Sequence, residues 1–263
     1  MFDVSSYLSK LGYNGSLEPT VRLLRELQKR HLVAIPFDNS LNADAKRGLE
    51  VLGDVDIDVD AVFGAIVVGG RGGVCYELNG LMRKLLQELG YDTHILSAGV
   101  IQVNGGFGPD LEHIFNAVHV DGEIWLVDVG LAGPSYLEPL RFPGAGSEEI
   151  QTLHGVEYRF VEADGYHVLQ RRARGAEWGP MYRFRLEYRK LSDWGDVVDR
   201  LADFPLELSL LDTRLHSRAF DNGQWVLIGR RYLRIEDGRE EIRILAKPEQ
   251  YRKVVDMVLR GEA

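Results

Sequence analysis

The chain has 263 residues, of which 45% are hydrophobic and 27% are charged. This composition is typical of a soluble globular protein and excludes disorder, a collagen helix and a coiled coil. The formal charge of −9 at pH 7 gives a field that repels phosphate backbones, so we expect no nucleic-acid partner.

The single cysteine, Cys75, excludes an internal disulfide and a structural zinc site built from several cysteines. The first residues lack a basic segment followed by an apolar run, and the apolar stretch at residues 61–68 is too short to span a bilayer. We therefore expect a cytoplasmic protein that does not bind membranes.

Hydrophobic periodicity predicts that the first ninety residues are mainly helical. One helix is expected over residues 19–32, a second from Asp58, and a third that follows Cys75 and ends near Gly90. The alternating aspartates at 54–60 resemble a calcium loop but lack its turn glycine and its glutamate, so they indicate a solvated loop and a helix N-cap.

The pattern becomes alternating after Gly90, which predicts antiparallel strands separated by glycine-containing turns. These strands are expected at residues 94–103, 114–120, 123–129, 156–162, 166–171 and 181–188. A mixed unit follows, with a helix over 193–201, strands at 224–235 and 241–245, and a helix over 248–259. The fold class is therefore α+β, with helices over 1–90, a sheet over 91–190 and an α/β unit over 191–263.

Cys75 lies in a polar, glycine-rich segment at the predicted start of a helix. No Lys-Ser/Thr pair follows the glycines, so the segment does not fit a phosphate-binding loop. The helix macrodipole and the unpaired backbone N–H groups favour a thiolate at this position, and Arg71 is expected to add a cation nearby. A lone cysteine is more often a small buried hydrophobic residue, but the polar neighbours weaken that interpretation here.

Hairpin geometry selects the histidine that could serve Cys75 as a base. The Asp-Gly pair at 121–122 predicts a two-residue turn between two strands. In that register Asp128 is a diagonal neighbour of His113, about 7 Å away between backbones. His119 lies on the same face but roughly 13 Å from Asp128. We therefore predict a His113–Asp128 pair, the alternative being an ordinary strand histidine near an unrelated carboxylate.

Cys75, His113 and Asp128 together predict a nucleophile, a proton shuttle and an orienting carboxylate, and no metal ligands are assigned. Acyl transfer through a thioester is the natural chemistry of such a set. The order Cys, His, Asp also occurs in transglutaminase-like enzymes, and papain-like proteases use Cys, His, Asn, so hydrolase and transferase both stay open. A scaffold that binds an acyl or aromatic ligand with an inert Cys75 is the non-enzymatic alternative.

Several segments resemble the arylamine N-acetyltransferase family: RGGVCYELN at 71–79, His113, and WLVDVG at 125–130. Residues 7–8, 12–13, 35–39 and 229–231 extend the resemblance over most of the chain. It implies a helical bundle, an antiparallel β-barrel and a small α/β lid in the three regions defined above.

The resemblance also implies roles for individual residues. Cys75, His113 and Asp128 would form the catalytic triad, and Phe37, Gly130 and Leu131 would bind substrate. The enzyme would have no bound cofactor and would take an acyl group from a thioester onto Cys75, then pass it to an aromatic amine.

Some residues depart from the usual pattern of the family. Leu131 and Ala132 stand where an aromatic residue and a glycine are common, and residues 206–213 are more apolar than the family's polar lid segment. Residues 133–140 resemble the amide synthases of ansamycin polyketide pathways, which close a macrolactam from a carrier-protein thioester. We therefore favour such an amide synthase, with an acyl carrier protein as a partner, over an acetyl-CoA-dependent arylamine N-acetyltransferase.

Overall fold

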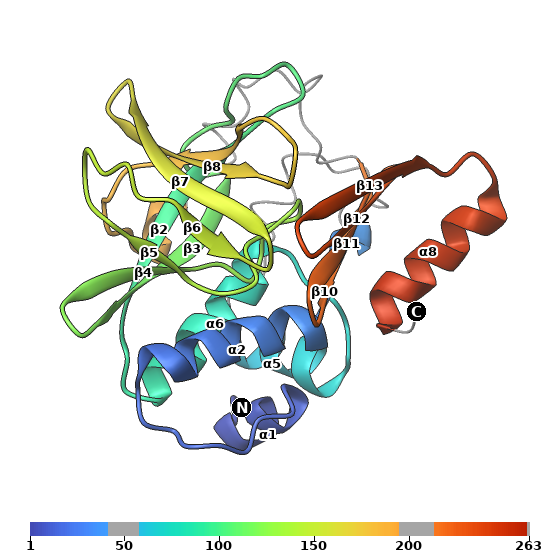
Figure 1. Ribbon diagram of the computed structural model, residues 1–263. Coiled ribbons are helices and arrows are strands. Elements are labelled where there is room, and N and C mark those ends of the chain that lie inside the picture. The colour runs from blue at the N-terminus through green and yellow to red at the C-terminus, as the bar shows by residue number, and fades with distance from the viewer. Residues whose placement is uncertain (42–57, 195–212, 262–263) are drawn as a thin grey trace.

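Figure 1 shows the computed structural model, which describes residues 1–41, 58–194 and 213–261. A group of helices lies beneath an eight-stranded antiparallel sheet, and a smaller five-stranded sheet with a C-terminal helix lies beside both (Figure 1). The predicted α+β class is confirmed. None of the helices in these ranges has the length and apolar character that a bilayer-spanning segment needs.

Capping side chains mark the start of the first three N-terminal helices. The N-terminal helices are α1 (Val4–Lys10), α2 (Val21–Ala34), α5 (Val59–Phe63) with a π-helical extension (Gly64–Val68), and α6 (Cys75–Glu88). Asp58 accepts hydrogen bonds from the first backbone N–H groups of α5, as the N-cap interpretation expects. Gly90 adopts a φ of 88° just after α6, which ends that helix.

The large sheet has the order β5-β4-β3-β2-β9-β8-β7-β6 and is curled into a nearly closed barrel. Its strands are β2 (Asp92–Val100), β3 (His113–Val120), β4 (Glu123–Val127), β5 (Leu140–Phe142), β6 (Gln151–Leu153), β7 (Val156–Ala163), β8 (Tyr166–Arg172) and β9 (Gly179–Phe184). The strand predicted at 181–188 therefore ends four residues early.

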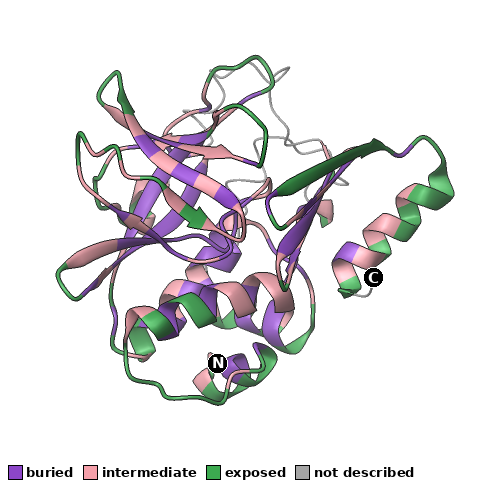
Figure 2. Ribbon diagram, viewed as in Figure 1, coloured by how far each residue is buried: buried purple, intermediate pink, exposed green. Residues whose placement is uncertain are grey.

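The hairpin between β3 and β4 has the predicted register. Asp121 and Gly122 both have positive φ, at 53° and 78°, and Val120 pairs with Glu123. Side chains of β3 alternate between two cores: Phe115 packs inside the barrel, whereas Val118 packs against the helices. Figure 2 shows this buried seam between α6 and the sheet.

The small sheet and the last helix are called the lid here. The lid contains β10 (Leu215–Phe220), β11 (Gly223–Ile228), β12 (Arg231–Glu236), β13 (Arg239–Ile244) and α8 (Pro248–Arg260), and β1 (Phe37–Asp38) pairs with β10 at its edge. The segment predicted at 224–235 is thus two strands, because Gly229 turns the chain at a φ of 55°. Strand β10 was not predicted.

Two predictions concern residues that are only partly described. The structure has a 3₁₀ turn at Leu191–Trp194, which overlaps the first two residues of the helix predicted at 193–201, and residues 195–201 lie outside the described residues. The apolar segment at 206–213 lies outside them too, except for Thr213. The final helix was predicted at 248–259 and agrees with α8.

A buried histidine in the helical part makes stability depend on pH. The Tyr7 hydroxyl and Nδ1 of His31 lie 2.8 Å apart, and Nε2 of His31 has no hydrogen-bond partner among the described residues. Burial lowers the pKa of His31 to about 3. The folded chain therefore holds this ring neutral under conditions in which the unfolded chain protonates it.

We expect wild-type stability to fall as the pH drops from about 6.5 toward 3, because only the unfolded state binds the proton in that window. At about 1.4 kcal/mol per pH unit, the loss between pH 6.5 and 4.5 is about 2–3 kcal/mol. Urea unfolding at several pH values should show a flatter dependence for His31→Gln than for the wild type. His154→Gln, which changes a partly exposed histidine, is the control, and an equal slope in wild type and His31→Gln would refute this assignment.

Candidate active site

The segment before Cys75 is held against β1 by close backbone packing. Asp38 donates its N–H to the Gly73 carbonyl at 2.9 Å, and Gly73 donates to the Pro36 carbonyl at 3.3 Å. A Cβ on Gly72 would lie 2.6 Å from the Asp38 side chain, so only glycine permits this approach. The packing fixes half-buried Cys75 as the first residue of α6.

Arg71 forms an ion pair that the sequence analysis did not predict. Its guanidinium makes two hydrogen bonds to the Glu77 carboxylate, and Glu77 Oε2 also accepts the Val74 N–H at 3.0 Å. Glu77 therefore balances the positive charge of Arg71, and the ion pair stabilises the turn that leads into α6. The effect of Arg71 on the Cys75 thiol stays a prediction.

His113 and Asp128 form the predicted pair. Nε2 of His113 lies 2.7 Å from Oδ2 of Asp128, and both side chains are almost completely buried. Oδ1 of Asp128 accepts hydrogen bonds from Asn79 Nδ2 and from the Gly130 N–H, each at 2.9 Å. Three donors thus hold the carboxylate in one orientation.

The environment of His113 favours its charged form. Burial lowers the pKa of this imidazole, but the attraction and hydrogen bond of Asp128 outweigh burial, and Cys75 adds a smaller contribution, so that the pKa rises to about 10. Cys75 lies close enough to the ring to contribute to this rise in pKa. Because Nε2 faces Asp128, Nδ1 is the nitrogen that remains for the thiol. The geometry thus places an imidazolium between a carboxylate and a thiol.

Asn79 is a central residue that the sequence analysis did not identify. It lies one turn after Cys75 on α6, and its amide joins three segments: Nδ2 donates to the Ile114 carbonyl at 2.8 Å and to Asp128, while Oδ1 accepts the Val129 N–H at 2.9 Å. Asn79 is a polar residue inside an apolar stripe and lies four residues after Cys75, on the same face of the helix. This spacing is the signal that could have identified it.

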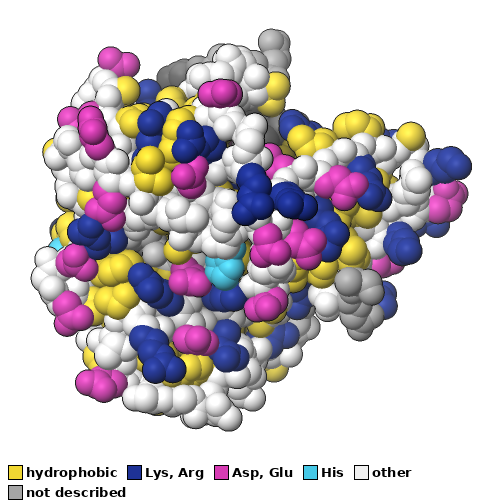
Figure 3. Space-filling view, viewed as in Figure 1, with side chains coloured by type: hydrophobic (Ala, Val, Ile, Leu, Met, Phe, Trp, Pro, Cys, Tyr) yellow, Lys and Arg dark blue, Asp and Glu magenta, His cyan; other side chains and the backbone are white. Residues whose placement is uncertain are grey.

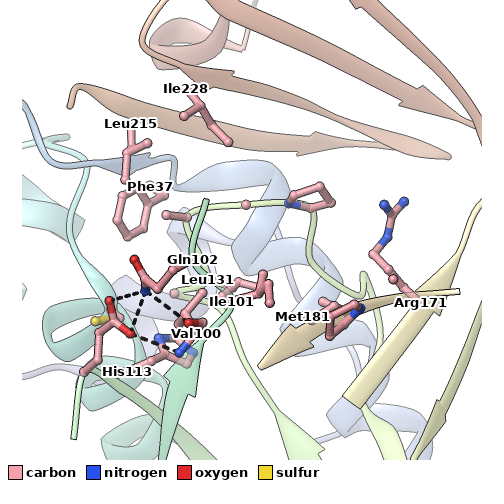
Figure 4. Close-up of a pocket in the computed structure, with 18 of the residues that line it drawn as sticks. Phe37, Val100, Ile101, Gln102, His113, Leu131, Arg171, Met181, Leu215 and Ile228 are labelled. Atoms are coloured by element: carbon pink, nitrogen blue, oxygen red, sulfur yellow. Dashed lines mark hydrogen bonds between the residues drawn. The ribbon is translucent and has the colours of Figure 1, made fainter. Parts of the chain in front are cut away.

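A cavity of about 400 Å³ opens directly onto Cys75 and His113. The predicted residues Phe37, Gly130 and Leu131 line it. Figure 4 shows apolar side chains that reach the cavity from three places: Phe37 from β1, Met181 from the barrel, and Leu215 and Ile228 from the lid. A Cβ on Gly130 would lie 2.6 Å from Cα of Cys75, so this glycine lets the wall pass close to the nucleophile.

The cavity also has a polar corner that the sequence analysis missed. Gln102 donates from Nε2 to both carboxylate oxygens of Glu112, at 3.0 and 3.2 Å, and to the Val100 carbonyl at 3.0 Å (Figure 4). Burial raises the pKa of Glu112, although hydrogen bonds from Val100 and Gln102 oppose that shift. At the other end, Arg171 of β8 forms an ion pair with Glu240 of the lid at 2.6 Å.

The model of the N-acetyltransferase family matches residues 20–260. Proansamycin X synthase of Amycolatopsis mediterranei is 40% identical over 100% of this chain and 98% of its own length, and arylamine N-acetyltransferase of Mycolicibacterium smegmatis is 34% identical over 73% of this chain and 67% of its own.

A solved structure shares the fold. The arylamine N-acetyltransferase of Mycobacterium marinum in complex with CoA superimposes with a TM-score of 0.79 at 27% identity, covering 99% of this chain and 94% of that one. The barrel, the helices beneath it and the lid are therefore the architecture of known acyl-transferring enzymes. The chain belongs to the arylamine N-acetyltransferase family and is an acyltransferase.

Proposed function

We propose that this enzyme is an amide synthase, which takes a long acyl chain onto Cys75 and passes it to an aromatic amine. One observation carries the proposal: Cys75, paired with His113, opens onto a cavity whose walls are mainly apolar. The 40% identity to proansamycin X synthase over the whole chain supports it further. We favour the form of this reaction in which an arylamine at the other end of the acyl substrate attacks the acyl-enzyme and closes a macrolactam.

The first half-reaction uses the thiolate of Cys75 and the imidazolium of His113. The sulfur attacks the carbonyl carbon of a thioester, a new C–S bond forms, and the donor's C–S bond breaks. His113 gives its proton to the departing thiolate, which leaves as a free thiol. The products are an acyl-enzyme at Cys75 and a neutral imidazole.

The second half-reaction restores the starting state. The aromatic amine attacks the carbonyl carbon of the acyl-enzyme, the C–N bond forms, and His113 accepts the proton that the amine loses. The C–S bond then breaks, and Cys75 leaves as a thiolate beside the imidazolium. Asp128 keeps the ring oriented through both steps.

The acyl donor is proposed to be a chain carried by an acyl carrier protein. The alternative is acetyl-CoA with a free arylamine, and the family supports it, since the M. marinum enzyme was solved in complex with CoA. The two functions share the proposed triad and differ in the size of the acyl group. Leu131, which is smaller than an aromatic ring and lines the cavity, favours the longer group.

Acylation should therefore be faster with a long chain than with acetyl. Burying roughly 100 Å² of additional apolar surface at about 25 cal/mol per Å² gives about 2.5 kcal/mol, or roughly a factor of 70. Single-turnover acylation of Cys75, followed by intact mass, would compare decanoyl and acetyl thioesters that share the same small thiol, so that only the acyl group differs.

The variant Leu131→Phe provides the matched control for this comparison. A ring at this position narrows the cavity, so the preference for decanoyl should shrink while acetyl transfer persists. Equal or faster acylation by the acetyl donor in the wild type would contradict the amide synthase and favour an acetyl-CoA-dependent arylamine N-acetyltransferase.

A further inference from the structure

Two histidines and an aspartate meet at the end of the barrel remote from Cys75. Strand pairing places Asp92 of β2 directly opposite His119 of β3, and His94 lies two residues along β2 on the same face. One potential ligand atom from each side chain lies within 4.8 Å of the other two. We propose that Asp92, His94 and His119 form a binding site for Zn²⁺.

The site is separate from the catalytic centre. His113 and His119 occupy opposite ends of β3, six residues apart, which corresponds to about 20 Å along a strand. Their side chains share the face of β3 whose middle residue, Phe115, packs in the barrel interior. The three ligands thus lie on two neighbouring strands at the far end of the barrel, where both histidines are half-buried and Asp92 is exposed.

Contacts already hold the three side chains near the geometry of a metal site. Nε2 of His94 lies 3.1 Å from Oδ1 of Asp92. The ring centroids of His94 and His119 lie 5.2 Å apart, and the ring planes form an angle of 84°, so the edge of one ring faces the plane of the other. Tyr188 stacks on His94 at 4.1 Å, and its hydroxyl is 2.5 Å from Nε2 of His119. Tyr188 therefore orients both imidazoles.

The donor set matches zinc. Imidazole nitrogens and a carboxylate bind Zn²⁺ at about 2.0–2.2 Å, in a tetrahedron whose fourth position water or a further side chain can fill. Antiparallel strands hold the backbones of all three ligands, so rotations of the side chains suffice to close the site. Zn²⁺ would lie between the His94 nitrogen and the Asp92 oxygen that now face each other, and a ligand that carries a proton would release it to solvent.

The position of the site suggests a structural role. It would join β2, β3 and the segment around Tyr188, and the backbone N–H of Arg189 already donates to the Ile95 carbonyl at 2.8 Å. Bound zinc would thus fasten the segment that leaves the barrel at this end. Sequence analysis assigned no metal ligands because these residues become neighbours only when the strands pair.

Zinc binding to the chelator-treated, full-length protein tests this proposal by calorimetry and elemental analysis. We expect one zinc per chain, a higher melting temperature with zinc, and affinity at least about tenfold lower in His94→Ala and His119→Ala. Excess Mg²⁺, which prefers oxygen ligands, should not compete. His154→Ala is the matched control. His154 pairs with Glu138 at 3.0 Å and, among the described residues, does not belong to the cluster of Asp92, His94 and His119.

Cys75→Ala must be measured in parallel, because a thiol beside a histidine also binds zinc. Retained affinity in Cys75→Ala supports the barrel site, and lost affinity would overturn it by assigning the zinc to Cys75. Unchanged affinity in both His94→Ala and His119→Ala would overturn it as well. The circular dichroism of the metal-free variants shows whether they fold, and His119→Gln replaces His119→Ala if the latter does not.

Discussion

Replacing His113 by alanine is expected to lower acyl transfer about 10³-fold or more. In the proposed mechanism, the variant would lose the acid that protonates the departing thiol and the base that accepts the proton of the amine. Asp128 would also be left as a buried carboxylate without its ionic partner. Thioester turnover, measured alongside the melting temperature of the variant, separates lost catalysis from lost folding.

His119→Ala is the control for this change. His119 lies on the same face of the same strand, but its side chain contacts His94 and Tyr188 at the other end of the barrel. Its removal should cost far less turnover than the removal of His113. If His119→Ala were the inactive variant, the assignment of the base would be wrong.

Asp128→Asn is expected to cause a loss of similar size, for a different reason. The new amide keeps the shape of the carboxylate, but it carries no charge and can present an N–H to Nε2 of His113. The ring would then be held as a neutral imidazole with its proton on Nδ1, toward Cys75. In a serine protease, the corresponding change of tautomer costs about 10⁴-fold in kcat.

The pH dependence of the Asp128→Asn variant distinguishes this effect from simple misfolding. Burial lowers the pKa of His113 and Asp128 raises it to about 10, so removing the charge should let the pKa fall well below that value. In the wild type the ring stays protonated as the pH rises toward 10, and in the variant it loses the proton at much lower pH. Histidine NMR titration measures the pKa of His113 in the wild type and in the variant. Activity of Asp128→Asn within tenfold of the wild type would contradict the role of Asp128.

The sequence predicted those parts of the site that depend on local geometry. The Asp-Gly turn at 121–122 determines the register of its hairpin, and that register places His113 beside Asp128. The start of α6 places Cys75 at a helix N-terminus, and the apolar stripe of that helix faces the sheet. Each of these inferences needs only a short segment whose backbone conformation the residue types restrict.

Other parts depend on contacts between distant segments. Gln28 of α2 accepts the N–H of Asp128 at 3.3 Å, although 100 residues separate them. Asn39 receives the N–H of Leu215 at 2.7 Å, which aligns β10 with the N-terminal region. Arg71 pairs with Glu77, six residues later, and the sequence analysis did not predict that ion pair. Local sequence patterns do not predict which distant residue a polar side chain will contact in the folded protein.

Formation of an acyl-enzyme at Cys75 tests the central claim most directly. The protein is mixed with a decanoyl thioester without amine, and its intact mass is measured before and after addition of an arylamine. We predict that the mass rises by one acyl group, that peptide mapping locates this group on Cys75, and that the amine removes it as an amide. Absence of the adduct from the wild type, or an equal adduct on Cys75→Ala, would contradict the account.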